Sequence, residues 1–319
     1  MKGLLTFLIG IAMGLASHAQ EYPVRPVRIV VAYPPGGNTD IVARLMADHF
    51  SRAWGKPVLV ENRAGAGGTV GTDHVAKSAP DGYTILLAAL ATNATAPAVY
   101  ARLPYDPVTD FAYIAPLTFT PNVLLVNSKL PVNSMKDLIA HVRANHGKFN
   151  YSSPGVGLSN HLAMELLLKA ANIDALHVPY KGSAQATTAV IAGEVQMTLD
   201  PVSSSLQHVR AGTLKALGVS ARTRSPLLPN VPTFAEAGIA DVEAYTWTGL
   251  AVPATTPAEI VARLHRDTVA ILGLPEMRER LSAMGSDPVD MNPQQFQVFI
   301  RNEARKWGDI ARRVGARVE

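Results

Sequence analysis

Residues 27–40 read VRIVVAYPPGGNTD, and they are followed by a segment of helical period that ends near Trp54. The β-branched run at 27–32 predicts a buried strand, and the two glycines predict a tight loop before a helix over 39–54. Similar strand–loop–helix units recur further along the chain. Strands that alternate with helices imply right-handed crossovers, so the sequence predicts an α/β fold with mainly parallel sheets.

The alternating pattern runs through two successive blocks, which a stretch marked by prolines separates. The expected strands are 27–32, 58–61, 83–88, 122–127, 149–152, 175–178 and 195–199, and the expected helices are 39–54, 69–77, 133–145, 160–171 and 184–192. Two blocks of this kind predict two α/β lobes.

Three later helix starts carry capping signals. They are SMKD at 134–137, TPAE at 256–259 and NPQQ at 292–295, and the last two place proline at the first helical position. The final helix has apolar residues close to one face, which favours packing over a ligand site. These residues are Phe296, Phe299, Ile300, Trp307, Ile310 and Val314.

The first twenty residues differ from the rest of the chain. One charge, Lys2, precedes an apolar run at 4–16, and small residues stand at the first and third places of Ser17-His18-Ala19. This layout is typical of a signal peptide, so we expect residues 1–19 to be removed on export to the periplasm. A transmembrane anchor is the alternative, but a bilayer span needs about 20 apolar residues and this run is shorter.

Composition excludes several classes of function. Lysine and arginine number 29 against 25 acidic residues, and a net charge of +4 is too small for a basic nucleic-acid-binding surface. The chain has no cysteine, which removes disulfides, thiol nucleophiles, iron–sulfur clusters and thiolate zinc sites. We therefore expect no nucleic-acid partner.

The sequence holds no local catalytic, nucleotide or metal motif. The glycine run at 65–71 departs from G-x-G-x-x-G at Val70, and His141 and His146 are five residues apart, which does not place both on one helix face. We therefore expect no cofactor, no metal and no enzymatic activity. A triad assembled from distant serine, histidine and aspartate stays open as an alternative.

Four loops between a strand and a helix are rich in glycine and small polar residues. They read YPPGGNTD at 33–40, ENRAGAGGT at 61–69, SSPGVGLSN at 152–160 and PYKGS at 179–183. Each exposes unpaired N–H groups at a helix N-terminus, whose dipole favours a carboxylate or a phosphate. Loops after parallel strands share one sheet edge, so together they predict a clamp for a small anion between two lobes. Tight turns without a ligand are the alternative interpretation.

Four side chains near these loops have two interpretations each. Asp200 either caps a loop or accepts a donor from the ligand, and Asp40 either caps the first helix or contacts the ligand. The rings of Tyr33 and Tyr180 either form walls of the pocket or pack in the core.

Seven ordered segments carry a resemblance to a known family. They are YPVRPVRIVVAYPPGGNTDIVAR, ENRAGAGG, PDGYTILLA, LPYDPVTDF, YSSPGVGLSNHLAMELL, HVPYKG and RSPLLPNVPTFAEAG. With them the chain resembles the Bug family of periplasmic solute receptors, the extracytoplasmic binding proteins of tripartite tricarboxylate transporters. The match covers nearly the whole chain after residue 19.

The resemblance implies a two-lobed, type II periplasmic-binding-protein fold that closes over a small organic carboxylate. It implies that amides of the first two loops hold the carboxylate, that ordered waters bridge it to the first lobe, and that the second lobe completes the pocket. The implied ligand-binding residues are Tyr33, Gly36, Gly37, Asn38, Thr39, Ala66, Gly67, Gly68, Ala88, Thr92, Ser152, Ser153, Asn160, Tyr180, Gly182 and Asp200. The implied partners are the organic acid and the membrane subunits of the transporter, and we expect a monomeric receptor.

Three positions depart from the family pattern. Tyr33 stands where phenylalanine is usual, Pro154 replaces a small residue and removes an N–H donor, and Pro201 follows Asp200 in place of a frequent asparagine. These changes lie near the distal end of the ligand, so they bear on its identity rather than on the binding mode.

We expect residues 21–120 and 251–319 to form lobe 1 and residues 121–250 to form lobe 2. Chain crossings near 121–127 and 246–250 are the expected hinge. The alternative functions are a periplasmic enzyme acting on a carboxylic acid and a sensory ligand-binding partner of a signalling system.

Overall fold

The computed structural model describes residues 22–286 and 289–317, so the predicted signal peptide at 1–19 lies outside the described residues. The strands are β1 (Val27–Val31), β2 (Val58–Asn62), β3 (Thr84–Ala89), β4 (Phe111–Asn127), β5 (Asn150–Ser153), β6 (Leu176–Pro179), β7 (Met197–Pro201), β8 (Leu214–Val219) and β9 (Tyr245–Pro253). The helices are α1 (Asn38–Trp54), α2 (Thr69–Ala76), α3 (Ala96–Val99), α4 (Met135–Ala144), α5 (Ser159–Ala171), α6 (Ser183–Ala192), α7 (Val202–Arg210), α8 (Ala258–Leu272), α9 (Pro275–Ala283) and α10 (Pro293–Arg313). A short 3-10 turn, Ala66–Gly68, precedes α2, and a π-helical turn, Ala91–Thr95, precedes α3.

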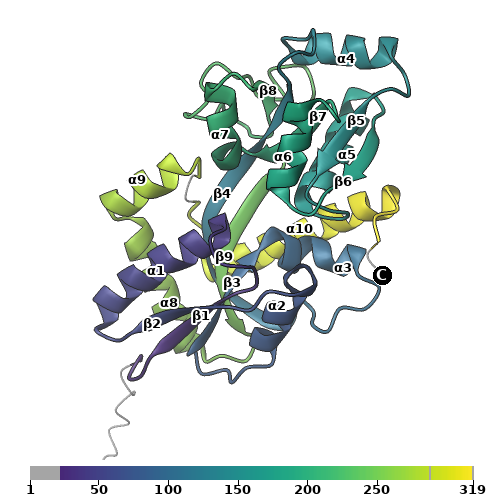
Figure 1. Cartoon of the computed structure of the whole chain (residues 1–319). Coiled ribbons are helices and arrows are strands. Elements are labelled where there is room, and N and C mark those ends of the chain that lie inside the picture. Colours follow the sequence, from purple (N-terminus) through teal and green to yellow (C-terminus); the bar gives the residue numbers. More distant parts are fainter. Residues whose placement is uncertain (1–21, 287–288, 318–319) are drawn as a thin grey trace, which may run out of the picture.

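Two sets of parallel strands are joined by long antiparallel strands. β1 pairs in parallel with β2 and β3, and β5 pairs in parallel with β6 and β7. β9 is antiparallel to β3 and β4, while β4 is also antiparallel to β7 and β8. In Figure 1 the first set lies in the lower part and the second in the upper part, with β4 and β9 running between them. This arrangement agrees with the predicted two-lobed α/β fold.

The expectation of parallel strands holds for β1–β3 and β5–β7, but it fails for β4, β8 and β9. The expected strand at 122–127 is only the end of β4, which begins at Phe111 and is buried along nearly its whole length. A strand covered on both faces has no polar alternation to reveal it. In addition, Pro116 and Pro121 resemble breaks in the sequence, although Pro116 sits at a register shift between β4 and β9, where a missing N–H is tolerated.

Helix α10 fixes the region where β4 and β9 run side by side. It packs against β4, α3 and α5. Phe296 and Phe299 meet Trp247 of β9 edge-on, with ring centroids 6.0 and 5.7 Å apart, and Phe296, Trp247 and Trp307 are fully buried. The predicted packing role of this helix face is confirmed.

Two of the three predicted capping motifs form. The Ser134 hydroxyl accepts the Asp137 amide at 3.1 Å, and Asn292 and Gln295 make a reciprocal capping box with two bonds of 2.9 Å. The capping box expected at 256–259 is wrong, because the Thr256 hydroxyl donates to the Pro253 carbonyl at 2.7 Å and no side chain caps α8. A search of the described residues finds no helix with the length and apolar character that a bilayer crossing needs.

Candidate functional site

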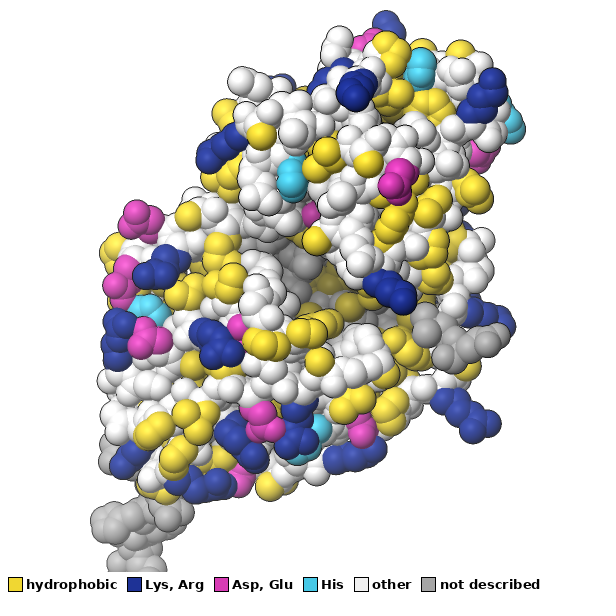
Figure 2. Space-filling view, viewed as in Figure 1, with side chains coloured by type: hydrophobic (Ala, Val, Ile, Leu, Met, Phe, Trp, Pro, Cys, Tyr) yellow, Lys and Arg dark blue, Asp and Glu magenta, His cyan; other side chains and the backbone are white. Residues whose placement is uncertain are grey.

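The glycine loops approach one another around a hollow. The surface is hollowed between the part that holds β1–β3 and the part that holds β5–β8 (Figure 2). A Cβ at Gly68 would lie 2.7 Å from Thr92 Cγ2 and 3.2 Å from Tyr33 Cζ, so the loops after β1, β2 and β3 are in contact. A Cβ at Gly157 would lie 2.7 Å from Val99 Cγ1, so the loop after β5 touches α3. The structure therefore brings the predicted loops of both blocks together.

The first loop is built around the carboxylate of Asp40. This group accepts the Gly36 amide at 2.9 Å, two bonds from Arg44 at 2.9 and 3.0 Å, and the Asn62 side chain at 2.9 Å. The hydrogen bond from Arg44 lowers the pKa of Asp40 to about 2, so the carboxylate is charged at neutral pH. Asp40 therefore accepts the Gly36 amide within the loop, and the predicted cap of the first helix is wrong, because no side chain of the described residues caps α1.

The first turn of α1 keeps its amides free. Gly37 is the N-cap, no side chain caps the helix, and the amides of Asn38 and Thr39 have no intrahelical acceptor. Gly37 has a φ of −79°, and a Cβ built on it would meet nothing within 4 Å. The fold does not require glycine at this position, and its bare backbone leaves the end of α1 open to a ligand.

The second loop contains four successive residues with positive φ. The values are 146° at Gly65, 44° at Ala66, 65° at Gly67 and 98° at Gly68. The Gly68 amide donates to the Gly65 carbonyl at 2.9 Å, whereas the amides of Ala66 and Gly67 have no acceptor in the part of the chain that is described. Successive amides in a tight turn form a concave cradle for an anion. The second loop therefore offers two free donors of the three predicted.

The Tyr33 hydroxyl is buried beside the second loop and has no hydrogen-bond partner among the described residues. The neighbouring Thr92 hydroxyl lies 2.8 Å from Asn93 Oδ1. Burial raises the pKa of Tyr33 to about 12, so the hydroxyl keeps its proton. Ala88 lies inside the sheet, where it is fully buried and pairs with Gly249. Tyr33 thus keeps a buried, protonated hydroxyl beside the second loop, whereas the Ala88 side chain lies in the hydrophobic core.

Asp200 and Asn160 form a buried polar pair at the ends of β7 and α5. Asn160 Nδ2 donates to Asp200 Oδ1 at 3.1 Å and to the Leu199 carbonyl at 2.8 Å, and the Ser204 hydroxyl donates to Asp200 Oδ2 at 2.6 Å. Burial raises the pKa of Asp200 to about 6 in spite of these bonds. The pair joins α5 to the start of α7 through side-chain donors, and within the described residues no side chain caps α7, so the capping interpretation of Asp200 stays a prediction.

The remaining candidates of the upper part differ in placement. The Ser152 hydroxyl donates to the Ala186 carbonyl at 2.8 Å and is fully used there. Gly182 has a φ of 114° and is the N-cap of α6, which no side chain caps. The hydroxyl of Tyr180 reaches Glu194 at 3.3 Å, and with it lines a shallow pocket on α6 rather than the walls of the other loops.

His161 and His177 lie beneath the third loop and are not among the predicted site residues. The Gly157 amide donates to His161 Nδ1 at 3.0 Å, and Ser153 Oγ lies 2.6 Å from His177 Nε2. The sequence did show that His161 follows Asn160 at the start of the helix after the third loop. Nothing in the sequence placed the strand residue His177 opposite it.

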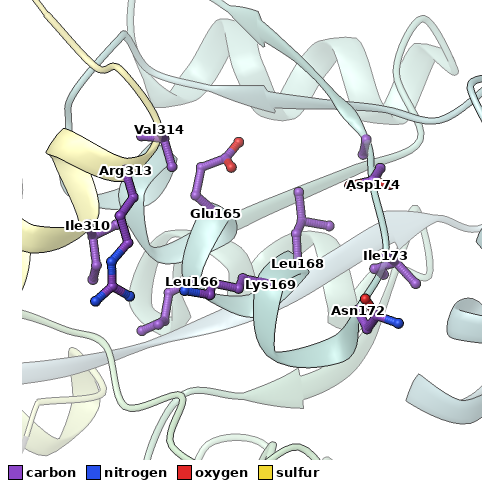
Figure 3. A pocket seen from close by; sticks show the side chains of 11 residues that line it. Glu165, Leu166, Leu168, Lys169, Asn172, Ile173, Asp174, Ile310, Arg313 and Val314 are labelled. Atoms are coloured by element: carbon purple, nitrogen blue, oxygen red, sulfur yellow. The ribbon is translucent and has the colours of Figure 1, made fainter.

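A cavity of about 480 Å³ lies between α5 and the end of α10 (Figure 3). Glu165 and Lys169 of α5 and Arg313 of α10 line it, together with apolar side chains, and none of its lining residues is a predicted site residue. No group of three histidine, aspartate or glutamate side chains suited to a metal occurs within the described ranges. His141 packs against Phe149.

Open helix ends that face a hollow between two α/β parts, joined by two crossing strands, define a solute-binding receptor. Residues 42–316 match the family described as tripartite tricarboxylate transporter family receptor. The chain belongs to this family, whose members are periplasmic receptors and not enzymes.

One sequence relative and two solved structures agree with this assignment. The chain is 35% identical to protein BugT of Bordetella pertussis over 318 residues, and this alignment covers 99% of this chain and 97% of BugT. The structure of R. palustris Rpa4515 with adipate matches with a TM-score of 0.84 at 34% identity, covering 93% of this chain and all of that one. MatC from Rhodopseudomonas palustris with bound malate matches with a TM-score of 0.78 at 32% identity, covering 91% and 99%.

Proposed function

We propose that this receptor binds a small organic carboxylate in the hollow between two lobes and delivers it to the membrane subunits of a tripartite transporter. The observation that carries the proposal is the set of open N-termini of α1, α5 and α6, because amides at helix ends stabilise a carboxylate without a charged side chain. The adipate and malate of two structural relatives are carboxylates of the expected size.

The ligand carboxylate binds the free amides of the first two loops. Asn38, Thr39, Ala66 and Gly67 offer these amides, and the Tyr33 hydroxyl supplies a further donor nearby. The first two loops, at 33–40 and 61–69, therefore bind the carboxylate. The far end of the ligand meets the upper loops, which comprise Ser152, Ser153, Asn160, Tyr180, Gly182 and Asp200.

Closure of two lobes completes the site. Lobe 1 comprises residues 21–120 and 251–319, lobe 2 comprises residues 121–250, and the crossings near 121–127 and 246–250 are the hinge. Residues 1–19 direct export to the periplasm and are removed, and the mature receptor is a monomer. Limited proteolysis with and without ligand tests the hinge, since closure is expected to protect the crossings.

A thermal-shift screen tests the ligand class. The panel contains malate and the linear dicarboxylates of four to eight carbons, with adipamide as a neutral match for adipate. A ligand at 100 times its dissociation constant stabilises the native state by about 2.7 kcal/mol, whereas the diamide is expected to give no shift. A shift with adipamide equal to that with adipate would contradict recognition of a carboxylate.

Recovery of the bound molecule separates the receptor from its alternatives. Unchanged ligand recovered in stoichiometric amount is expected, and conversion to a product would indicate an enzyme. Uptake of that ligand by cells should stop when the receptor gene is deleted. Continued uptake with a lost transcriptional response would instead indicate a sensory partner.

A further inference from the structure

Three aromatic side chains are stacked beneath the third loop. The rings of His161 on α5 and His177 on β6 lie face to face, with centroids 3.9 Å apart and an interplanar angle of 11°. The Tyr151 ring stacks on His177 at 4.9 Å. His161 is 5% exposed and Tyr151 is fully buried. Apolar side chains would fill this space equally well, so the two imidazoles call for an explanation in terms of their nitrogen atoms.

Each imidazole binds one end of the loop formed by residues 153–157. His161 Nδ1 accepts the Gly157 amide at 3.0 Å. His177 Nε2 lies 2.6 Å from Ser153 Oγ, and that hydroxyl donates to the Gly155 carbonyl at 3.0 Å. Ser153 Oγ also accepts the Gly155 amide at 3.2 Å, and the donor in its bond with His177 Nε2 depends on the imidazole tautomer. The loop is thus held at Ser153 by His177 and at Gly157 by the acceptor His161 Nδ1.

The surroundings keep both rings neutral. Glu165 of α5 is the charged group near the stack: it accepts the Tyr151 hydroxyl, and its Oε1 is 4.0 Å from His161 Nε2. This carboxylate also lines the cavity between α5 and α10 (Figure 3). Burial lowers the pKa of each histidine to about 4. A neutral His161 presents the lone pair of Nδ1 to the Gly157 amide, whereas a protonated ring would place its own N–H donor against the N–H donor of Gly157.

The loop that these histidines hold also forms a contact between the two parts of the molecule. Gly157 has a φ of 73° and packs on Val99 of α3. Two residues further on, α5 begins with Ser159 and Asn160, and Asn160 binds Asp200. A shift of the loop would therefore displace the open end of α5 and the buried polar pair together.

We propose that His161 and His177 are positioning residues that hold the third loop in the shape that ligand binding requires, through Gly157 and Ser153. The proposal rests on the proposed function, since the loop borders the hollow assigned to the ligand. The histidines themselves act through the loop and not on the ligand.

Matched substitutions separate the hydrogen bonds from the ring packing. His177→Gln keeps an amide that can donate or accept at the position of Nε2 and removes the ring, whereas His177→Phe keeps a ring and removes the hydrogen-bonding nitrogen. In the same way, Asn at position 161 retains an acceptor at the position of Nδ1, and Phe retains only the stack. The variants to compare are therefore His177→Gln with His177→Phe and His161→Asn with His161→Phe.

Two measurements are made on the full mature protein at pH 7.5. Calorimetric titration with malate and with linear dicarboxylates of four to eight carbons gives the affinity, and hydrogen exchange of the ligand-free protein gives the protection of the Gly157 amide. The Phe variants are expected to lose about tenfold or more in affinity and to exchange Gly157 faster. The Gln and Asn variants are expected to stay within about threefold of the original protein.

Equal losses in the Phe and polar variants, or full affinity in both Phe variants, would overturn the positioning role. If His161→Phe does not fold, the comparison of His177→Gln with His177→Phe, at a half-buried position, still tests the positioning role. If the unmodified protein binds no member of the panel, the carboxylate proposal fails for that panel, and hydrogen exchange decides the positioning role alone. Unchanged protection of Gly157 in His161→Phe would then reject it.

Discussion

Helix N-termini in this protein are completed in two ways. At α4 and α10 the side chains of Ser134 and Asn292 accept the first free amides. At α1, α5 and α6 the N-cap residues are Gly37, Leu158 and Gly182, and no side chain accepts a cap bond. Among the described helices, α2, α3, α7, α8 and α9 also lack side-chain caps; α8 and α9 each begin beside an exposed proline, where water reaches the amides.

The difference separates donors used for stability from donors kept for a ligand. A capping side chain contributes about 1 kcal/mol to stability, and an open end around the hollow gives up that contribution. The open ends of α1, α5 and α6 belong to loops that converge, whereas the capped ends belong to helices outside this set. A missing side-chain cap does not by itself identify the site, because α3, α7, α8 and α9 share it; α1, α5 and α6, with α2, are the uncapped helices that follow the four glycine loops.

The largest expected effect comes from obstructing an open end. Gly37→Val adds a branched side chain where a Cβ meets no atom within 4 Å, so the fold is expected to be unaffected. The side chain blocks an oxygen that must lie about 2.9 Å from the amides. We expect affinity for the carboxylate to fall at least about 100-fold by calorimetric titration, with the melting temperature unchanged.

Gly37→Ala is the graded control and is expected to lose less affinity than the valine variant. Full affinity in Gly37→Val would break the link between open ends and ligand binding, because the site would then lie elsewhere.

The next largest effect is expected in the pH dependence of stability, through the carboxylates of Asp40 and Asp200. Asp40 has a pKa lowered to about 2 by Arg44, and Asp200 has a pKa raised to about 6 by burial. Since the folded-state pKa of Asp200 lies above its unfolded value, this group's contribution to stability is present at low pH and is lost as the pH rises through 6. At pH 8 its ionisation costs about 3 kcal/mol.

Asp200→Asn is therefore expected to raise the free energy of unfolding at pH 8 by up to about 3 kcal/mol, and to change it little at pH 4. Asp40→Asn is the matched control and should destabilise the protein at pH 8, because it removes a charged partner of Arg44. Denaturant titrations at both pH values measure these changes. A destabilising Asp200→Asn at pH 8 would mean that the carboxylate is needed in its charged form.

The smallest effect is expected at a capped end. Asn292→Ala removes the bond from the Gln295 amide to Asn292 Oδ1, keeps the bond from the backbone amide of residue 292 to Gln295, and should lower stability by about 1 kcal/mol. Affinity for the carboxylate should be unchanged, since α10 offers no free donors to the hollow. A loss of affinity at constant stability would show that capped and open ends are not separate in function.

The sequence predicted the parts of the fold that depend on local pattern. The βα unit at β1–α1 follows from a β-branched run, a glycine loop and helical period, and the unit at β5–α5 follows from its glycine loop and helical period. Only the end of β4, at 122–127, was predicted, and β8 and β9 were missed. Strands buried on both faces, such as β4, have no alternation, and Pro116 resembled a break. The antiparallel order depends on how distant segments pair, which no short motif records.

The site was predicted at the level of loops rather than atoms. The glycines of the second and fourth loops adopt positive φ, as expected for loops that are rich in glycine. Which amides remain free depends on acceptors that the fold supplies, such as Asp40 for Gly36 and Gly65 for Gly68. The histidines beneath the third loop come from different elements, so only the structure brings them together.

The 17 residues of β4 pair with β9 at one end and with β7 and β8 at the other. The part that holds β1–β3 is therefore encoded by two separate pieces of the gene, because β9 pairs with β3, and the part that holds β5–β8 needs the end of β4. A fragment limited to residues 128–244 would contain β5–β8 but would lack the strand between β7 and β8. Attempts to produce the halves separately should yield insoluble material unless the missing strand is supplied by a second fragment.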